Sequence, residues 1–484
     1  MTGSVDMFMR GVSVGNEHKG GVRRRWLHSC SLAALAIVVP VVMHAPCAHA
    51  ETISGALAKS YGFSPDLNQQ RAATRAADEG VPRATAGWRP TVTATSSVGS
   101  SQNRIVNNGR LQQDTNTLPR VNSVAMTQTL YNGGRTGNTV RQAESTILQS
   151  RETLRLSEQQ TLLNAATAYM NVLRDTAILE LQNNNVQVLK EQLNQTQNRF
   201  HVGEVTRTDV AQSEASLAQG QASAVTARFN LQNSMASYRQ YVGDHPSNLE
   251  PARPVEPLLP RSLDAAIMAG QKNHPQIQAV LHAVDVAALA VTVQEGALLP
   301  TLTATGTATV NKEPSGFPNY QSKVFAAVAS LSVPLYEGGA TYAAIRQAKE
   351  QLGQARLNAD LQRESIRSLT TSAWGSFETS KLTILSYQAQ VRANEIALNG
   401  VREEAKVGQR TTLDVLNAQQ TLLSARVNLV TAQRDQVVFS YNLLSATGQL
   451  SAATLGLRVP NYDPTLHYDQ VKGKWIGTRT PDGN

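Results

Sequence analysis

The chain has few of the residues that build disulfides, thiolate metal sites or an aromatic core. Of its 484 residues only two are cysteine, Cys30 and Cys47, and only 5% are aromatic. Both cysteines lie in a leader that we expect to be removed, so the mature chain would hold no disulfide and no thiolate metal site. Abundant Gln, Asn, Ala, Thr and Ser suit long helices with narrow seams of small residues.

A secretory signal peptide is predicted over residues 1–50. Arg23-Arg24-Arg25 precede an apolar run from Leu32 to Met43, and Ala48-His49-Ala50 supplies a cleavage site of the A-x-A type. The apolar run is too short to cross a bilayer as a helix. A lipid anchor on Cys47 is the alternative, but its sequence context is poor for lipidation.

No stretch after the leader approaches eighteen consecutive apolar residues, so we expect no transmembrane helix. The sequence has no His-Glu-x-x-His motif and no Gly-rich phosphate loop. We therefore predict no enzyme, no catalytic residue, no metal and no cofactor. Loss of the leader lowers the net charge from +8 to +5, and this mild excess along long helices indicates no nucleic-acid partner.

The remaining sequence consists of two related halves, and internal repeats of this kind indicate how a fold is built. Leu130-Tyr131-Asn132-Gly133-Gly134 matches Leu335-Tyr336-Glu337-Gly338-Gly339 at an offset of 205, and Gly243 matches Gly448 at the same offset. We predict a first structural repeat over residues 51–243, a linker over 244–261, a second repeat over 262–448 and a C-terminal tail over 449–484.

Each half contains two segments with the period-two alternation of a β-strand. These segments run from Thr91 to about Ile105, from Val121 to Tyr131, from Thr301 to Val310 and from Val324 to Leu335. Polar loops over residues 107–116 and 311–320 are expected to join them in pairs. About ten alternating residues match the length of a membrane-spanning strand, although one such pair alone could be a soluble hairpin. Trp88, Tyr131 and Tyr336 stand where strands give way to helices, which predicts membrane-interface aromatics.

Long polar helices follow the strands in each half. The segment from Thr136 to His201 has no proline, and at about 1.5 Å per residue it would reach about 95 Å. The helix from Thr412 to Leu444 carries apolar residues at a strict seven-residue spacing, which predicts coiled-coil packing. Four strands are too few for a barrel, and open sheet edges are costly in hydrocarbon, so several chains must share one barrel.

A turn that occurs twice joins the long helices. Val202-Gly203 in the first copy corresponds to Val407-Gly408 in the second, and Asp209 corresponds to Asp414. Gly just past a helix end, followed by Thr and Asp, is a sequence pattern that ends one helix and begins the next. The simplest interpretation is an αα-hairpin turn in which Asp209 and Asp414 are helix N-caps.

Together these features resemble those of the TolC family of outer-membrane efflux and secretion channels. The resemblance includes Gly-Trp-Arg-Pro before the first strand, Leu-Tyr-x-Gly-Gly after each hairpin and Val-Gly…Asp-Val at each tip. It implies an α+β membrane protein, a homotrimer with a twelve-stranded β-barrel (four strands per chain) continued by a long periplasmic α-helical barrel. It also implies an export channel for efflux or type I secretion in the outer membrane of a Gram-negative bacterium. Such a channel contacts outer-membrane lipid, docks to a periplasmic adaptor and serves an inner-membrane transporter.

The resemblance also implies roles at the two tips. Arg410 matches an arginine that links to a neighbouring chain, with Thr208 and Asp209 as its partners. Asp414 matches a carboxylate that lines the constriction, where a ring of three would select cations. Asn417 stands where the family often has a second aspartate, so we expect a less acidic gate. Four tip residues would contact the adaptor: Val202, Gly203, Val407 and Gly408.

A different class of protein, a periplasmic coiled-coil scaffold or adaptor without a pore, is the alternative. Such a protein would share the long helices. It would have no use for four alternating Thr-rich strands in two hairpins. Neither interpretation identifies the exported substrate or the partner pump.

Overall fold

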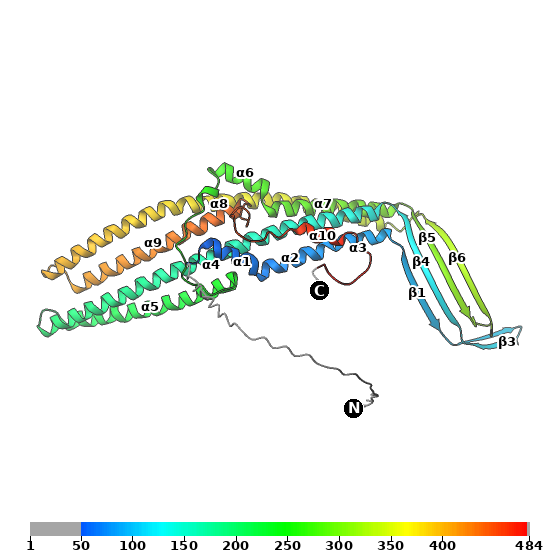
Figure 1. Ribbon diagram of the computed structural model, residues 1–484, viewed down its shortest axis with the longest axis horizontal. Helices are drawn as coiled ribbons and strands as arrows, with labels where there is room; N and C mark the ends of the chain where they lie inside the picture. Colours follow the sequence, from blue (N-terminus) through cyan, green and yellow to red (C-terminus); the bar gives the residue numbers. More distant parts are fainter. Residues whose placement is uncertain (1–49, 482–484) are drawn as a thin grey trace, which may run out of the picture. The chain divides into compact units, whose positions relative to one another are not determined.

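The computed structural model describes residues 50–481. The predicted signal peptide over residues 1–50 therefore lies outside the described residues, apart from Ala50. The described part consists of an antiparallel sheet, two long helical hairpins and shorter helices packed beside the long ones (Figure 1).

The two halves follow the same order of strands, long helix, turn and second long helix. The first half comprises α1 (Ile53–Phe63), α2 (Pro65–Asp78), α3 (Gly80–Thr85), η1 (Ala86–Trp88), β1 (Thr91–Val98), β2 (Ser101–Asn107), β3 (Arg110–Thr117), β4 (Arg120–Asn132), α4 (Arg135–His201) and α5 (Arg207–Val242). The second half and tail comprise η2 (Glu256–Leu258), α6 (Leu263–Asn273), α7 (Pro275–Glu295), η3 (Gly296–Leu298), β5 (Thr301–Lys312), β6 (Gln321–Ser332), α8 (Ala340–Lys406), α9 (Thr412–Ala446) and α10 (Pro464–Val471). The boundaries of the repeats stay a prediction.

One antiparallel sheet contains strands from both halves, in the order β1-β4-β5-β6. The central pair is β4 and β5, so the two halves meet in the middle of the sheet. Within the described residues, β1 and β6 each pair on one side only, and they form the two edges of the sheet.

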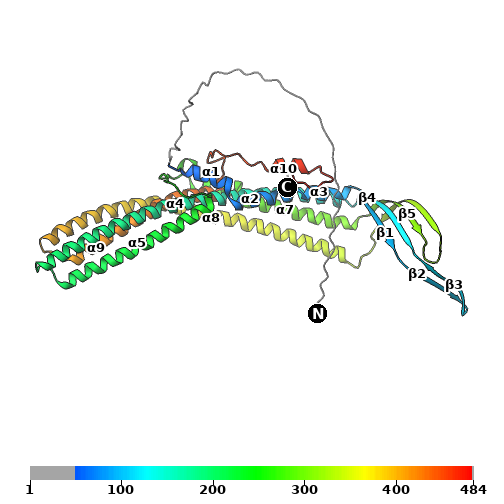
Figure 2. The ribbon, with the colours of Figure 1, turned by 60° about the horizontal axis from the view of Figure 1, so that its bottom comes forward.

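Two strand predictions were wrong at their ends. The first strand ends at Val98, and the predicted polar loop over residues 107–116 is part of a second hairpin, β2–β3, beyond the end of the sheet (Figure 2). Its turn holds Asn108 and Gly109 at φ +50° and +75°, the pair that favours a two-residue hairpin turn. The last strand ends at Ser332 rather than Leu335, because Pro334 has no N–H for the ladder.

The register gives the sheet one apolar face and one hydroxyl-rich face. Across the four strands Val92 pairs with Met126, Met126 with Gly306, and Gly306 with Ala327. Directly paired residues lie on the same face, so these four share one face of the sheet. The other face carries Thr93, Thr95, Ser97, Ser123, Thr127, Thr303, Thr305, Thr307 and Thr309. On the apolar face Val92 is 65% exposed and Phe325 80%. The apolar face suits lipid and the hydroxyl face suits a water-filled lumen.

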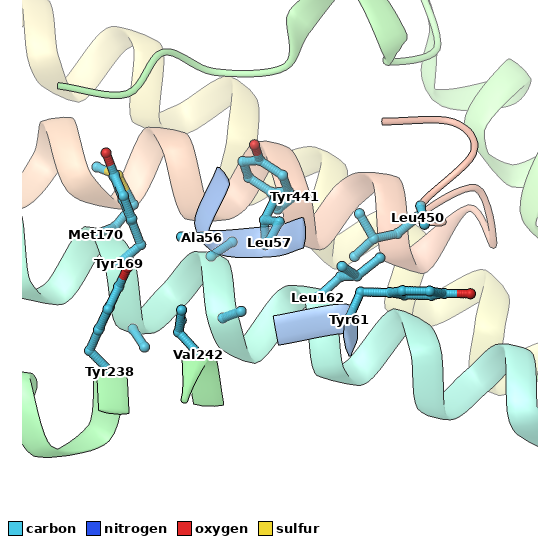
Figure 3. Close-up of a cluster of buried hydrophobic side chains, with 14 of the residues drawn as sticks. Ala56, Leu57, Tyr61, Leu162, Tyr169, Met170, Tyr238, Val242, Tyr441 and Leu450 are labelled. Atoms are coloured by element: carbon cyan, nitrogen blue, oxygen red, sulfur yellow. The ribbon is translucent and has the colours of Figure 1, made fainter. Parts of the chain in front are cut away.

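Residues of α1, α4, α5, α9 and the tail form the largest core cluster, beside the middle of α4 (Figure 3). Tyr169 of α4 is fully buried, and its hydroxyl donates to the carbonyl oxygens of Glu51 and Glu250 at 2.7 and 2.6 Å. Glu51 also forms a parallel bridge with Leu249. This cluster ties the first described residues and the linker between the halves to the long helix.

One described stretch, Leu263–Leu298, is long and apolar enough to cross a membrane, judged by length and composition. We expected no such stretch. It is divided between α6 and α7, and Pro275 begins the second helix. Because α7 packs along α4 and α8, we assign it to the helical part, and the strands remain the membrane-spanning segments.

Charge on the two sheet faces should have unequal effects. Ala308 lies beside Val124 and Phe325 on the apolar face, whereas the adjacent Thr307 points to the hydroxyl face. Ala308→Arg should cost about 2–4 kcal/mol because it places a cation in hydrocarbon, and it should deplete heat-modifiable folded protein in outer-membrane extracts. Thr307→Arg is the matched control and should assemble nearly normally. Equal losses would show that the faces are assigned wrongly.

The matched glycine pairs after β4 and β6 differ in their surroundings. Gly133 has φ +67°, and a Cβ there would lie 2.2 Å from the Gly296 carbonyl oxygen. Gly338 has φ +63°, but a Cβ there would meet nothing within 4 Å. Gly133→Ala should therefore destabilise more than Gly338→Ala, by about 1–3 kcal/mol of overpacking. Thermal unfolding of the detergent-solubilised protein, followed by circular dichroism, measures the difference, and equal midpoints would contradict it.

Candidate functional site

Each long helical hairpin turns in the same way at its tip. Helix α4 ends at His201 and α8 ends at Lys406. Gly203 and Gly408 follow with φ of +80° and +78°, the left-handed conformation that stops a helix and that glycine adopts without strain.

The next helix at each tip starts with a capping box. Thr206 is the N-cap of α5, and its backbone N–H and hydroxyl donate to Asp209 Oδ2 at 2.9 and 2.7 Å. Thr411 and Asp414 repeat this at α9, with distances of 3.0 and 2.9 Å. The N-cap interpretation of Asp209 and Asp414 is thus wrong by position, because both aspartates hold the third helical position and the threonines are the caps.

The capping boxes lower the pKa of both carboxyl groups. For Asp209 the larger cause is the hydrogen bond from the Thr206 hydroxyl, followed by that from its backbone N–H. For Asp414 the backbone N–H of Thr411 comes first and its hydroxyl second. Each tip therefore holds an ionised carboxylate at the positive end of a helix dipole.

An ion pair spans each turn, with the charges exchanged between the two halves. Arg199 at the end of α4 lies 3.0 Å from Glu204, whereas Glu404, its counterpart in α8, lies 2.8 Å from Arg410. The Arg410 and Glu404 side chains are 51% and 45% exposed. Glu404 was not predicted from the sequence, although opposite charges flank the short turn there. The link from Arg410 to a neighbouring chain stays a prediction.

The remaining predicted tip residues are accessible on the chain. Val202 and Val407, the C-caps of α4 and α8, are each 71% exposed. Thr208 is exposed in the first turn of α5. Asn417 is exposed one turn after Asp414 and lines a polar cavity of about 130 Å³ between α4, α5 and α9.

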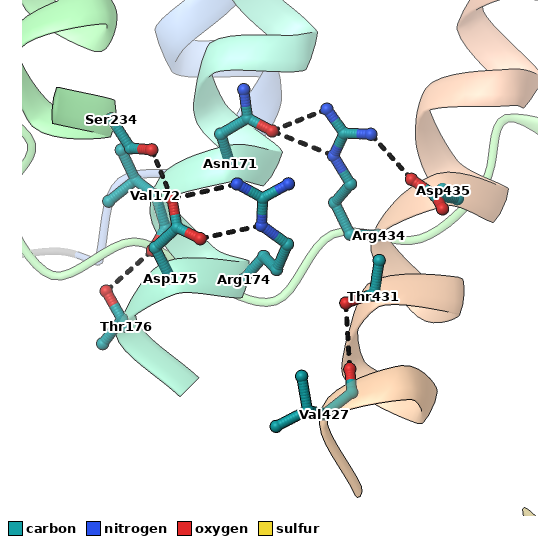
Figure 4. Close-up of polar contacts among 10 residues, drawn as sticks. All are labelled: Asn171, Val172, Arg174, Asp175, Thr176, Ser234, Val427, Thr431, Arg434 and Asp435. Atoms are coloured by element: carbon teal, nitrogen blue, oxygen red, sulfur yellow. Dashed lines mark hydrogen bonds and ion pairs between the residues drawn. The ribbon is translucent and has the colours of Figure 1, made fainter. Parts of the chain in front are cut away.

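Polar side chains join the two hairpins where α4 meets α9 (Figure 4). Arg434 of α9 donates from Nε and Nη2 to Asn171 Oδ1 at 2.9 and 2.6 Å, and from Nη1 to Asp435. One turn along α4, the buried Asp175 binds Arg174 and accepts a hydrogen bond from Ser234 of α5. Helix α4 is thus tied to both α5 and α9 at this level.

A second cross-connection lies nearer the tips. Arg402 of α8 donates to Gln419 of α9 at 3.0 Å, and Gln419 donates to the buried Asn185 of α4 at 3.4 Å. Apart from one arginine, neutral amides make these links. The two hairpins are therefore connected by hydrogen bonds at a second level, nearer the tips.

The predicted interface aromatics stand at the strand–helix junctions. Trp88 precedes β1, Tyr131 lies at the end of β4 and Tyr336 follows β6, with exposed fractions of 52%, 48% and 85%. Gln128 donates to the Trp88 carbonyl oxygen at 2.5 Å, which ties η1 to β4. Among residues 50–481 no group of three or more His, Cys, Asp or Glu side chains could hold a metal ion.

A sheet with membrane-type faces, joined to coiled-coil hairpins with exposed tips, defines an export channel of the outer membrane. The sequence profile described as "Outer membrane efflux protein" matches residues 57–244 and 268–449. The outer membrane efflux protein BepC of Brucella suis is 39% identical over 452 residues, which are 93% of this chain and 97% of BepC. The chain belongs to this outer membrane efflux family, the family of TolC.

Two further matches agree with that assignment. Outer membrane protein TolC of Escherichia coli is 28% identical over 316 residues, 62% of this chain and 64% of TolC. The Campylobacter jejuni CmeC outer membrane channel superposes with a TM-score of 0.74 at 16% identity, covering 87% of this chain and 89% of CmeC. The α+β fold, the TolC-type resemblance and the outer-membrane location are confirmed, and the scaffold without a pore is not supported.

The capping boxes give the tips a dependence on acid. Because the pKa of Asp209 and of Asp414 is lowered below 3.8 on folding, their stabilisation is complete above that value and is lost as the pH falls through the folded pKa. Hydrogen exchange of tip amides, corrected for intrinsic rates, should therefore accelerate only below about pH 4. Asp414→Asn should weaken the acid dependence at the second tip and leave that at the first tip unchanged. An unchanged profile in that variant would contradict the assignment.

Proposed function

We propose that three copies of the chain close one twelve-stranded barrel and that the helical hairpins continue it as a periplasmic tunnel. The observation that carries the proposal is the pair of open edges, β1 and β6. In hydrocarbon each unpaired backbone group costs several kcal/mol, so the edges must pair with other chains. Three sets of four strands exceed the minimum of about eight strands for a barrel.

In this assembly the two tips form a gate at the periplasmic end. Arg410 then exchanges between Glu404 in its own turn, 2.8 Å away, and the pair Thr208 and Asp209 on a neighbouring chain. Because the Arg410 and Glu404 side chains are both about half exposed, their ion pair is weak, and Arg410 can leave it for a partner on the neighbouring chain. Asp414 of the three chains would form the acidic ring, and Asn417, one turn further, would leave it less acidic.

The exposed turn residues are proposed as the adaptor contact. Val202 and Val407 present apolar side chains at 71% exposure, each followed by the glycine of its helix stop, Gly203 or Gly408. A partner that covers these two valines would remove exposed apolar surface from water, which favours binding there. A periplasmic adaptor of an inner-membrane transporter is the proposed partner. The channel itself is proposed to have no catalytic role, and its cargo is chosen by the pump.

Single-channel recording in a planar bilayer tests the gate. The wild-type protein should give a small cation-selective conductance, and Arg410→Ala should raise it severalfold because the link between chains is lost. Glu404→Gln is the matched control: it removes the competing partner within the turn, so conductance should stay low or fall. A rise in Glu404→Gln equal to that in Arg410→Ala would show that the bond within the turn holds the gate.

The same recording separates the pore from its gate. Asn417→Asp should strengthen cation preference, because it adds three carboxylates near the Asp414 ring. Unchanged selectivity would remove Asn417 from the constriction and leave the pore intact. No conductance in any variant, with the protein recovered from the periplasm without detergent, would overturn the channel.

A further inference from the structure

The C-terminal tail is bound along the first half of the chain and ends beside the sheet. Helix α10 packs on α2, with Val471 fully buried and His467 8% exposed. His467 Nδ1 lies 3.0 Å from the carboxylate of Asp78, whose side chain has no exposed surface. Arg151 of α4 lies over the Tyr468 ring at 5.5 Å. These contacts fix the direction in which the last described residues leave α10.

Arg89 contacts the end of the tail at the helix-proximal end of the sheet. Its guanidinium lies 4.6 Å from the Trp475 ring centroid, and its Nη1 donates to the Lys474 carbonyl oxygen at 2.7 Å. Arg89 lies between Trp88 and the first residue of β1, Thr91. The tail therefore meets the chain where the first membrane-spanning strand begins.

The side chains at this point are apolar and remain accessible. Trp475 is 67% exposed and Ile476 is 92% exposed, and Trp88, the residue before Arg89, is 52% exposed. Accessible apolar residues lie at the same, helix-proximal end of the other strands: Leu130, Tyr131, Leu299, Leu331, Val333, Leu335 and Tyr336. The apolar residues of the tail thus extend a band that the strand ends already form.

The charge of the segment suits a phospholipid surface. Residues 470–481 contain Lys472, Lys474 and Arg479 and no acidic residue. Lys472 is already paired with Asp469 of α10 at 2.7 Å, which leaves Lys474 and Arg479 as the cations that can meet a phosphate. Basic side chains flanking Trp and an aliphatic residue are typical of segments at the membrane interface, where the rings lie at headgroup depth and the cations reach the phosphates.

We propose that the segment Lys472–Arg479 is a membrane-interface anchor that binds the periplasmic leaflet of the outer membrane. Trp475 and Ile476 enter the interface, Lys474 and Arg479 contact lipid phosphates, and Arg89 positions Trp475 there. The anchor rests on insertion of the barrel but not on the gate at the opposite end of the helices. It stabilises the rim of the barrel where the wall changes from strands to helices.

Tryptophan fluorescence with brominated lipids tests the anchor in the assembled protein. After loss of the leader the tryptophans are Trp88, Trp374 and Trp475, so replacing two by Phe leaves each one alone. The variants are placed in phosphatidylethanolamine–phosphatidylglycerol vesicles that contain lipid brominated near the glycerol end of its acyl chains. Trp475 should lose as much fluorescence as Trp88, whereas Trp374, which packs on a buried cluster of α6, α8 and α9, should lose none.

The other outcomes overturn the proposal in distinguishable ways. If Trp88 is quenched by bromolipid and Trp475 is quenched only by aqueous iodide, the tail lies in water and the anchor fails while the channel stands. If neither agent quenches Trp475, a neighbouring chain covers it. If bromolipid quenches neither Trp88 nor Trp475, the strand ends do not lie at the bilayer surface and the membrane assignment of the sheet fails as well.

A positioning variant tests the role of Arg89. Arg89→Gln in the protein with Trp475 alone removes the stacking cation and the hydrogen bond to Lys474, so bromolipid quenching should fall and iodide quenching should rise. Arg83→Gln is the matched control, because it removes a nearby cation from α3 and should leave both signals unchanged. Undiminished bromolipid quenching in Arg89→Gln would remove Arg89 from the anchor.

Discussion

The structure depends on one constraint, that backbone N–H and C=O groups cannot remain unpaired in hydrocarbon. A single chain supplies four strands and leaves β1 and β6 as open edges. The sheet is therefore only part of a barrel, and its two faces, one apolar and one rich in threonine, have functions only when the barrel is closed. The same constraint explains why duplication is useful, because β4 from one half and β5 from the other form the central pair.

Helix α4 connects most of the remaining structure. It packs against α1, α2, α3, α5, α7 and α9, and its Tyr169 hydroxyl ties down Glu51 and Glu250. Polar links accompany this packing: Asn171 binds Arg434 at the level of the buried cluster, and Asn185 binds Gln419 nearer the tip. Helix α4 therefore joins the two hairpins by a buried aromatic cluster and by side-chain hydrogen bonds.

The two ends of the helical part are built on different chemistry. At the tips, charged and capped turns expose Val202 and Val407 to a partner in water. At the strand ends, a tail fixed by His467, Arg151 and Arg89 presents Trp475 and Ile476 beside the sheet. In the proposed function, the first surface is remodelled when Arg410 exchanges one weak ion pair for another. The second anchors the protein by apolar contact with a lipid surface.

The sequence by itself determined most of the helices and strands and their order. These follow from the local hydrophobic period and from the Gly, Pro and capping residues at the ends of the elements. Alternation placed β4, β5 and β6 to within a few residues of their limits, and Gly203 with Thr206 marked the first tip. It ran β1 on to about Ile105 and missed the β2–β3 hairpin. Local signals present in the sequence, Asn108-Gly109 and Pro334, would have indicated the turn of that hairpin and the end of β6. Only the tertiary structure decided the pairings that join distant positions, such as Arg410 with Glu404 across a turn, Arg434 with Asn171 and Trp475 with Arg89. Such pairings depend on how helices are rotated and aligned against one another, and no repeat or spacing along one chain specifies that geometry.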